Sequence, residues 1–307
     1  MNKNKTYLLG GLLVVLVVVA YFLTADTGTK TETESIPAKE KEFFTLDSAN
    51  VDRLEIVTSK GKIVLVKTAG TWRQTEPVDY PVTSTFVPPA VGDLKNFKLS
   101  SIVSVNPAKF ESYGFHDTNK VTVTVFEKGA PKGTIVIGNA GIGASQSYVK
   151  RADKNAVYLA DNLLRLNFVK EDIDGFRDKQ IVAVPTAMLK TIDFSYPDES
   201  FTITKDSLNR FTIGSDSIQY SNMEGYLNLL ANMNTQGFAA MGSLDSVKKF
   251  TAVIKITADK VYELDLLKVD GAAPYYLMRV AGKPAVFRFD ENLAKSFMKT
   301  KNSFLGK

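Results

Sequence analysis

The residue types that most often carry out enzyme chemistry are sparse in this sequence of 307 residues. His116 is the only histidine, in the turn-like segment GFHDTNK, and the chain has no cysteine. A Ser–His–Asp triad or a zinc site needs further partners at defined positions. We therefore interpret His116 as a solvated loop residue, and we predict no catalytic residue, no metal site and no cofactor.

Two short motifs resemble enzyme or metal signatures, but each is incomplete. The SxxK spacing of acyl-enzyme serines occurs at residues 246–249 and 296–299, without the SDN and KTG motifs that complete such sites. Residues 172–175, DIDG, begin like a calcium loop but lack the later acidic ligand. We expect a protein that is not an enzyme.

The glycine-rich segment GNAGIGAS at residues 138–145 is the first place where we expect binding. A phosphate-binding glycine loop opens a helix, whose free N–H groups hold the anion. Here the next residues, SYVKRAD, have a strand pattern, which favours a flexible hairpin loop. Exposed loops on rigid sheets often carry function. Gly138, Gly141 and Gly143 are therefore the candidate ligand-binding residues.

Two further features allow a structural or a functional interpretation. Residues 176–179, FRDK, carry both charge signs and favour a salt-bridged hinge or a contact between domains, with a partner-docking site as the alternative. Trp72 is the only tryptophan, and Phe211 falls at the matching place of a repeat described below. A repeated aromatic residue favours an anchor in each core over a sugar-stacking platform.

The elements that would position these residues follow an N-terminal run of twenty residues without charge, residues 6–25. A helix of that length spans about 30 Å, the thickness of the hydrocarbon core of a bilayer. We predict a cytoplasmic stub and transmembrane anchor at residues 1–25, with Lys3 and Lys5 keeping the N-terminus inside. A cleaved signal peptide is the alternative, although the run is longer than a usual signal core.

This anchor predicts a single-pass protein of the bacterial cytoplasmic membrane, with most of the chain outside the cytoplasm. Residues 26–42, rich in Thr, Glu and Lys, are too polar to form a core and predict a disordered tether. The net charge of +5 is small and dispersed, which argues against nucleic acid as a partner. The expected partners are the lipid bilayer, through residues 6–25, and other envelope or transporter proteins.

From residue 43 onward one pattern of alternating strands occurs twice. VDRLEIV and KIVLVK in the first copy recur as LKTIDFS and SFTITK in the second. The best match joins residues 147–168 to residues 275–297 with one inserted residue. It pairs Tyr148 with Tyr276, Arg151 with Arg279, Val157 with Val286, Asp161 with Asp290 and Phe168 with Phe297. We expect Asp161 and Asp290 to cap short helices.

One longer helix is predicted in each copy. Residues 220–233 have apolar positions at helical spacing with Ser221 as a plausible N-cap, and residues 83–97 contain Pro88 and Pro89, near which that helix should begin or kink. We therefore predict an α+β fold, with a transmembrane helix followed by two similar modules of mainly antiparallel sheet and helices on one face. The modules are expected at residues 43–184 and 185–307, and one fused sheet is the alternative.

The first copy resembles a bacterial family catalogued as a domain of unknown function, number 4340. The resemblance covers about residues 43–184 and, more faintly, the second copy. It lies in the order of short motifs: GTW at 70–72, YGF at 113–115, IG at 137–138, YVKR at 148–151, VY at 157–158 and FRDK at 176–179. It implies an envelope protein with one anchor, and some members accompany ABC-type transport systems of the gliding-motility kind. It implies no activity and no catalytic residues.

These features favour a membrane-anchored extracytoplasmic scaffold or accessory protein, with an ABC-type transport complex as the partner implied by the resemblance. The alternative is an extracytoplasmic receptor for glycan or peptide. A wall-modifying enzyme is a third hypothesis.

Overall fold

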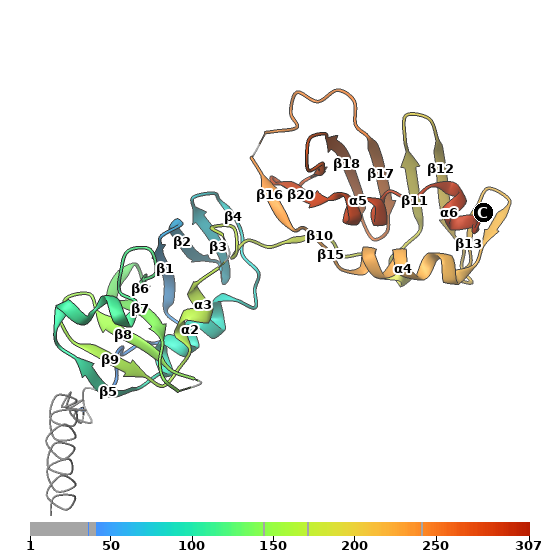
Figure 1. The fold of residues 1–307 in the computed structure, drawn as a ribbon. Helices are drawn as coiled ribbons and strands as arrows, with labels where there is room; N and C mark the ends of the chain where they lie inside the picture. Colours follow the sequence, from blue (N-terminus) through green and yellow to red (C-terminus); the bar gives the residue numbers. More distant parts are fainter. Residues whose placement is uncertain (1–35, 37–40, 144, 171, 241) are drawn as a thin grey trace, which may run out of the picture. The chain divides into compact units, whose positions relative to one another are not determined.

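The computed structural model describes residue 36 and residues 41–307, with the exception of 144, 171 and 241 (Figure 1). The expected anchor at residues 1–25 and most of the expected tether at 26–42 lie outside this part of the chain. Among the residues that are described, no helix is both long enough and apolar enough to cross a bilayer.

Two large, mostly antiparallel sheets dominate the described chain. The strands of the first sheet lie side by side in the order β4 (Tyr80–Pro81), β3 (Thr71–Glu76), β2 (Gly61–Thr68), β1 (Val51–Thr58), β6 (Val121–Glu127), β7 (Ala130–Ala140), β8 (Ser147–Arg151), β9 (Val157–Ala160) and β5 (Leu99–Ser104). The strands of the second sheet have the order β14 (Asp216–Ile218), β13 (Phe211–Ile213), β12 (Ser200–Lys205), β11 (Thr191–Ser195), β17 (Ala252–Thr257), β18 (Val261–Val269), β19 (Tyr275–Val280), β20 (Val286–Asp290) and β16 (Gly237–Ala239).

The two nine-stranded sheets have the same strand order when each is counted from its own first strand. The predicted α+β class with mainly antiparallel sheet is confirmed, and the alternative of one fused sheet is wrong, because the sheets are separate. A small additional sheet pairs β10 (Gln180–Val182) with β15 (Met233–Asn234). Short 3-10 helices occur as η2 (Pro107–Lys109), η3 (Glu111–Tyr113) and η4 (Thr186–Met188).

The chain divides into two compact units whose limits differ from the predicted modules. The first unit comprises residues up to Gly61 and Pro88–Val169, and the second comprises Lys62–Val87 together with Lys170–Lys307. Residues 62–87 and 170–184, which we expected in the first module, therefore group with the second unit.

Helix α2 (Val87–Asn96) confirms the expected effect of the two prolines, because Pro88 and Pro89 occupy its first turn. Proline is tolerated there since those N–H groups have no partner within the helix. Its buried residues are apolar. Next to α2, the rings of Phe43, Phe44 and Phe97 pack together with centroids 4.8 to 6.5 Å apart. This aromatic cluster closes one side of the core of the first unit.

Helix α4 (Tyr220–Ala231) buries Met223, Tyr226, Leu227 and Leu230, the apolar positions that the spacing predicts. Ser221 does not cap it, because the helix begins one residue earlier and Gln219 occupies the capping position without a side-chain hydrogen bond.

Helices α5 (Glu291–Phe297) and α6 (Lys301–Leu305) follow at the end of the chain. Asp290 caps α5 as predicted, since its carboxylate accepts a hydrogen bond from the Leu293 N–H at 2.9 Å. Asp161 does not cap the equivalent helix α3 (Leu164–Phe168), because it lies too far before the helix and accepts from the Lys98 N–H at 2.7 Å instead.

The strand register corrects the predicted match between Arg151 and Arg279. Val157 and Val286 begin β9 and β20, as their predicted correspondence requires. Val157 pairs with Lys150, however, whereas Val286 pairs with Arg279. Lys150 is therefore the counterpart of Arg279, and Arg151 lies one residue further along.

The same shift separates Tyr148 from Tyr276, because a difference of one residue moves a side chain to the other face of a sheet. The inserted residue of the predicted alignment therefore belongs before Lys150 and not after Arg151. The tyrosine and arginine residues have the same spacing in both copies, but they lie on opposite faces of the two sheets.

Candidate functional site

The loop between β7 and β8, which holds the candidate glycines, is closed by its own hydrogen bonds. The Gly141 N–H donates to the carbonyl oxygen of Gln146 at 2.9 Å, and the Gly143 N–H donates to Oε1 of the same residue at 2.8 Å. A Cβ at Gly141 would lie 2.6 Å from the Leu159 side chain, and one at Gly143 would lie 2.6 Å from the Gln146 side chain. The loop joins two strands as predicted. Close packing against Leu159 and the Gln146 Cβ explains Gly141, whereas the neighbour of Gly143 is the movable end of the Gln146 side chain.

Gly138 is also required by packing. A Cβ at Gly138 would lie 2.2 Å from the carbonyl oxygen of Tyr113 and 3.2 Å from the ring of Phe115. The Arg165 guanidinium donates to the carbonyl oxygens of Gly138 at 3.2 Å and Asn119 at 2.7 Å. Burial lowers the pKa of Arg165, but a guanidinium stays charged at physiological pH. Arg165 therefore ties α3 to the segment that precedes β6.

Two large apolar side chains are exposed on elements that adjoin β7. Ile142, in the β7–β8 loop, is 94% exposed, and Leu166, in α3, is 69% exposed. Helix α3 lies against β7, and Arg165, next to Leu166, reaches the strand at Gly138. We call Ile142 and Leu166 the apolar pair. The loop thus offers an exposed side chain rather than free N–H groups.

Three of the motifs that carry the family resemblance, YGF, YVKR and VY, meet in one small hydrophobic cluster. Phe115, Val136 and Val157 are buried there, and the rings of Tyr113 and Tyr148 pack edge to face at 4.9 Å. Burial raises the pKa of the Tyr148 hydroxyl. These residues stabilise one face of the first sheet, which explains their types without a catalytic role.

The remaining sequence candidates also have local structural roles. The Nδ1 atom of His116 lies 2.8 Å from the Thr118 hydroxyl in an exposed turn, as a loop residue should. The Ser296 hydroxyl donates to the Asn292 carbonyl oxygen at 3.0 Å within α5. Within the described ranges, no group of His, Cys, Asp and Glu residues is arranged to hold a metal ion.

Trp72 is buried in β3, and Phe211 is buried in the corresponding strand β13. The predicted aromatic anchor is confirmed, and a sugar-stacking platform at Trp72 is wrong, because its ring does not face solvent.

Arg177 of the FRDK motif forms a salt bridge, but its partner lies just before the motif. Arg177 is 4% exposed, and its Nη1 atom lies 2.8 Å from the Asp174 carboxylate. Its guanidinium carbon lies 4.5 Å from the ring centroid of Tyr80 and 3.6 Å from that of Phe238. All four residues belong to the second unit. Burial raises the pKa of Tyr80, partly opposed by the charge of Arg177. This arrangement is a buried cation held by aromatic rings.

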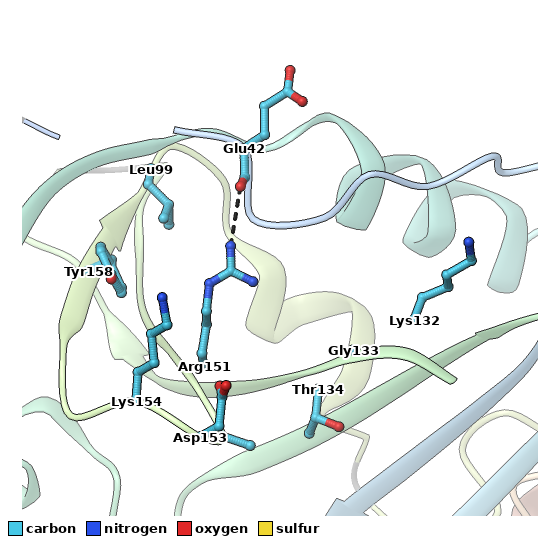
Figure 2. Close-up of a pocket in the computed structure, with 10 residues that line it drawn as sticks. Glu42, Leu99, Lys132, Gly133, Thr134, Arg151, Asp153, Lys154 and Tyr158 are labelled. Atoms are coloured by element: carbon cyan, nitrogen blue, oxygen red, sulfur yellow. Dashed lines mark hydrogen bonds between the residues drawn. The ribbon is translucent and has the colours of Figure 1, made fainter. Parts of the chain in front are cut away.

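A pocket of about 480 Å³ in the first unit is the strongest concave candidate (Figure 2). The residues that line it come from the segment before β1, from β5 and β7, and from β8, β9 and their connection. They are Glu42, Leu99, Lys132, Gly133, Thr134, Arg151, Ala152, Asp153, Lys154 and Tyr158. Sequence reasoning missed this site because its residues lie on segments far apart in the chain, from Glu42 to Tyr158. Arg151 and Tyr158 belong to the YVKR and VY motifs, but these motifs indicate no binding by themselves.

A second pocket, of about 440 Å³, lies in the second unit and has three carboxylates in its lining. Asp174 is paired with Arg177, and Asp290 accepts from the Leu293 N–H and from the Gln236 side chain. The third, Asp172, accepts a backbone hydrogen bond in its own turn. These carboxylates already have partners, so this pocket is the weaker candidate.

Comparison with known proteins finds one family. The model of the family described as "Domain of unknown function (DUF4340)" matches residues 72–251, more than half of the chain. No curated protein and no solved structure gives a significant match.

Proposed function

Because the chain belongs to the DUF4340 family, we propose that it is a non-enzymatic accessory protein of the bacterial envelope, anchored in the cytoplasmic membrane. The uncharged run at residues 6–25 supports the anchor, and Lys3 and Lys5 support an N-terminus inside the cytoplasm. The domains that follow then act outside the cytoplasm by binding other proteins.

The observation that carries a protein partner is the apolar pair. Ile142 stands on a loop that its own hydrogen bonds hold closed, so binding through it costs little loss of conformational freedom. An exposed isoleucine and leucine gain more from burial against a protein than from a polar glycan. This favours the scaffold or accessory function over the glycan receptor.

The shared strand order of the two sheets supports an internal duplication of one module. A duplicated platform gives a chain two surfaces of similar shape, and two linked contacts bind more tightly than either alone. A subunit of an ABC-type transport system is the partner that the family resemblance indicates.

The test is affinity capture of the tagged full-length chain from detergent-solubilised membranes, with the captured proteins identified by mass spectrometry. We expect membrane transport subunits or other envelope proteins, and we expect Ile142→Asp and Leu166→Asp to reduce their recovery at least fivefold. Leu208→Asp is the matched control, because Leu208 is also 69% exposed but lies in the second unit.

Two results would contradict the proposal. One is the recovery of no envelope protein above background. The other is equal recovery of the captured proteins with the Ile142→Asp chain and with the unchanged chain, which would show that Ile142 is not part of the binding surface.

A further inference from the structure

We propose that the pocket of the first unit binds a small molecule through a carboxylate or phosphate group, with Arg151 and Lys154 as the anion-binding side chains. This goes beyond the protein contact proposed above, because neither Ile142 nor Leu166 lines the pocket. Its volume of about 480 Å³ lies within the range of about 300–1,000 Å³ that small-molecule sites occupy.

Arg151 is held in place without being neutralised. Its guanidinium carbon lies 4.3 Å from the ring centroid of Phe43, and its Nη2 atom donates to the backbone oxygen of Glu42 at 3.3 Å (Figure 2). Within the described part of the chain, no carboxylate forms an ion pair with Arg151. The other N–H groups of its planar fork can therefore receive an oxyanion, whose geometry they match.

Two other charges of the lining are already compensated. Lys132 pairs with Glu127 at 3.0 Å, and the carboxylate of Glu42 pairs with Lys98 at 2.9 Å. In Figure 2 the Glu42 carboxylate points away from the Arg151 guanidinium. These pairs contribute little net charge to the pocket.

The charges that remain favour an anion. Lys154 and Arg151 extend side by side from the β8–β9 connection in Figure 2. Among the described residues, the Lys154 ammonium has no carboxylate partner. Asp153 is the one acidic group of the lining that is left to oppose these two cations, so the pocket keeps one net positive charge. Like-signed cations in a concave site attract a counter-ion more strongly than they would on an open surface.

The register explains why only the first unit has this cation. Since Lys150 is the counterpart of Arg279, Arg151 is the counterpart of Val280, which is buried. Arg151 lies on the same face of β8 as the buried Val149. A charged side chain at a core-facing position lowers the stability of the fold unless its charge is paired. A bound anion would supply that pairing for Arg151.

The experiment is isothermal titration calorimetry of the full-length chain in a non-ionic detergent at low salt. The probes are glucuronate, glycerol 3-phosphate and inorganic phosphate, and glucose is the neutral control. We expect at least one anion to bind and glucose to give no heat. Because exposed charges are screened by salt, binding should weaken when sodium chloride is raised to about 0.5 M.

Three substitutions on the exposed connection and its strand test the assignment without disturbing the core. Lys154→Gln should weaken the binding of the anion about tenfold, the effect of losing one charge-assisted hydrogen bond. Asp153→Asn should strengthen it about twofold, because the opposing charge is removed. Lys150→Gln is the matched control, since Lys150 lies on the other face of β8, over the ring of Phe110, and its ammonium reaches Lys154 only at the backbone oxygen, at 3.5 Å.

The probes distinguish the two sources of the anion. Binding of glucuronate alone identifies a carboxylate ligand, binding of the two phosphates alone identifies a phosphate ligand, and binding of all three identifies a general oxyanion site. The proposal is overturned if no anion binds, if Lys154→Gln leaves the affinity unchanged, or if Lys150→Gln lowers it equally. Loss of anion binding with normal capture of protein partners would leave the accessory function intact.

Discussion

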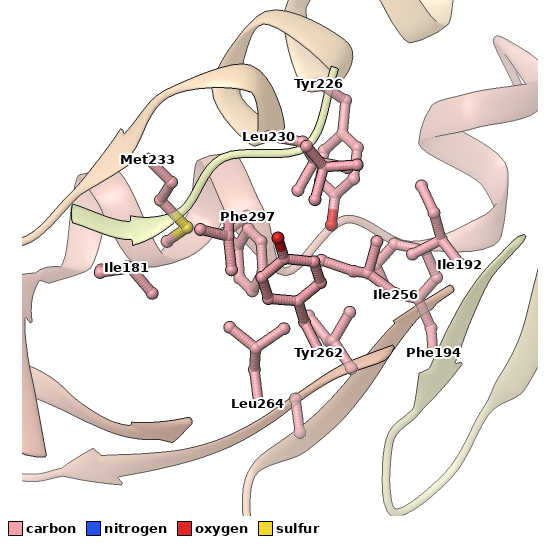
Figure 3. Packing of buried hydrophobic residues seen from close by; sticks show 14 of the residues in the cluster. Ile181, Ile192, Phe194, Tyr226, Leu230, Met233, Ile256, Tyr262, Leu264 and Phe297 are labelled. Carbon is pink, nitrogen blue, oxygen red and sulfur yellow. The ribbon is translucent and has the colours of Figure 1, made fainter. Parts of the chain in front are cut away.

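The Tyr226 hydroxyl allows a test of the packing of the second unit in which two similar substitutions should have opposite effects. Tyr226 is fully buried, and among the described residues its hydroxyl has no hydrogen-bond partner. Figure 3 shows the side chain reaching from α4 into a cluster of apolar residues. Tyr196, by contrast, donates its hydroxyl hydrogen to the Lys299 carbonyl oxygen at 2.9 Å.

The expected magnitudes follow from these two environments. A buried polar group without a partner costs about 1–3 kcal/mol, whereas a satisfied hydrogen bond stabilises by about 1 kcal/mol. Tyr226→Phe keeps the ring that stacks on Phe297 at 5.9 Å, so it should raise the free energy of unfolding by about 1 kcal/mol. Tyr196→Phe should lower it by about the same amount.

Native-state hydrogen exchange of the full-length chain, read by mass spectrometry, measures this for β17 and β18 separately from the first unit. Exchange of their most protected amides should slow about fivefold in Tyr226→Phe and accelerate about fivefold in Tyr196→Phe. A faster exchange in Tyr226→Phe would refute the reasoning, because it would mean that the hydroxyl stabilises the core.

The pH dependence provides an independent check. Burial raises the pKa of Tyr226 well above its usual value. The folded state therefore holds the phenolic proton more tightly than the unfolded chain, whose tyrosines titrate near pH 10. The stability is complete below about pH 10 and falls as the pH rises above it. Alkaline unfolding, followed by circular dichroism, should begin at a higher pH in Tyr226→Phe.

Three further predictions concern other parts of the chain. Gly138→Ala should destabilise the first unit by about 1–3 kcal/mol, because the new Cβ would overlap a backbone carbonyl. Gly92→Ala in α2 should not destabilise it, because no atom lies within 4 Å of the new Cβ. Urea unfolding compares the two variants. Arg177→Ala should lower the free energy of unfolding by about 3 kcal/mol, because it leaves a partly buried carboxylate unpaired. Arg210→Ala breaks an exposed ion pair and should lower it by under about 1 kcal/mol. Equal losses in urea unfolding would contradict the stronger effect expected for the buried arginine. The pKa of Asp290 is lowered by the hydrogen bond from the α5 backbone. The part of the protection of α5 that this cap contributes is therefore complete above about pH 4 and is lost as the pH falls below it. Asp290→Ala should remove that pH-dependent part in hydrogen exchange.

Most of the fold could be predicted from the period of the apolar residues. Alternation along β1, β6 and β12 identified strands, and the spacing in α4 identified its buried face. Both are local signals, because they depend only on which side chains meet the core. The α+β class followed from them.

The local sequence pattern does not predict which face of the sheet a side chain occupies where this depends on pairing between distant strands. The correspondence of Arg151 with Arg279 rested on matching letters, but pairing across β8–β9 and β19–β20 sets the face of each side chain. The residue type alone predicts that the three glycines bind a ligand, and this stays a prediction. The sequence does not predict that Gly138 packs against the Tyr113 carbonyl oxygen or Gly141 against Leu159. Neither fact is visible until the neighbouring strands are in place.

The pocket in the first unit lies where the two sheets differ in residue type at one equivalent position. In the second unit the residue before the turn between its two corresponding strands is Val280, which completes an apolar face against Leu264. In the first unit Arg151 takes that position opposite the buried Ile135. Its guanidinium cannot be buried unpaired in the core, so it stacks over Phe43 at the end of β8, beside the pocket. A single difference in residue type, Arg151 against Val280, thus places a cation beside a pocket of the first unit without altering the strand order.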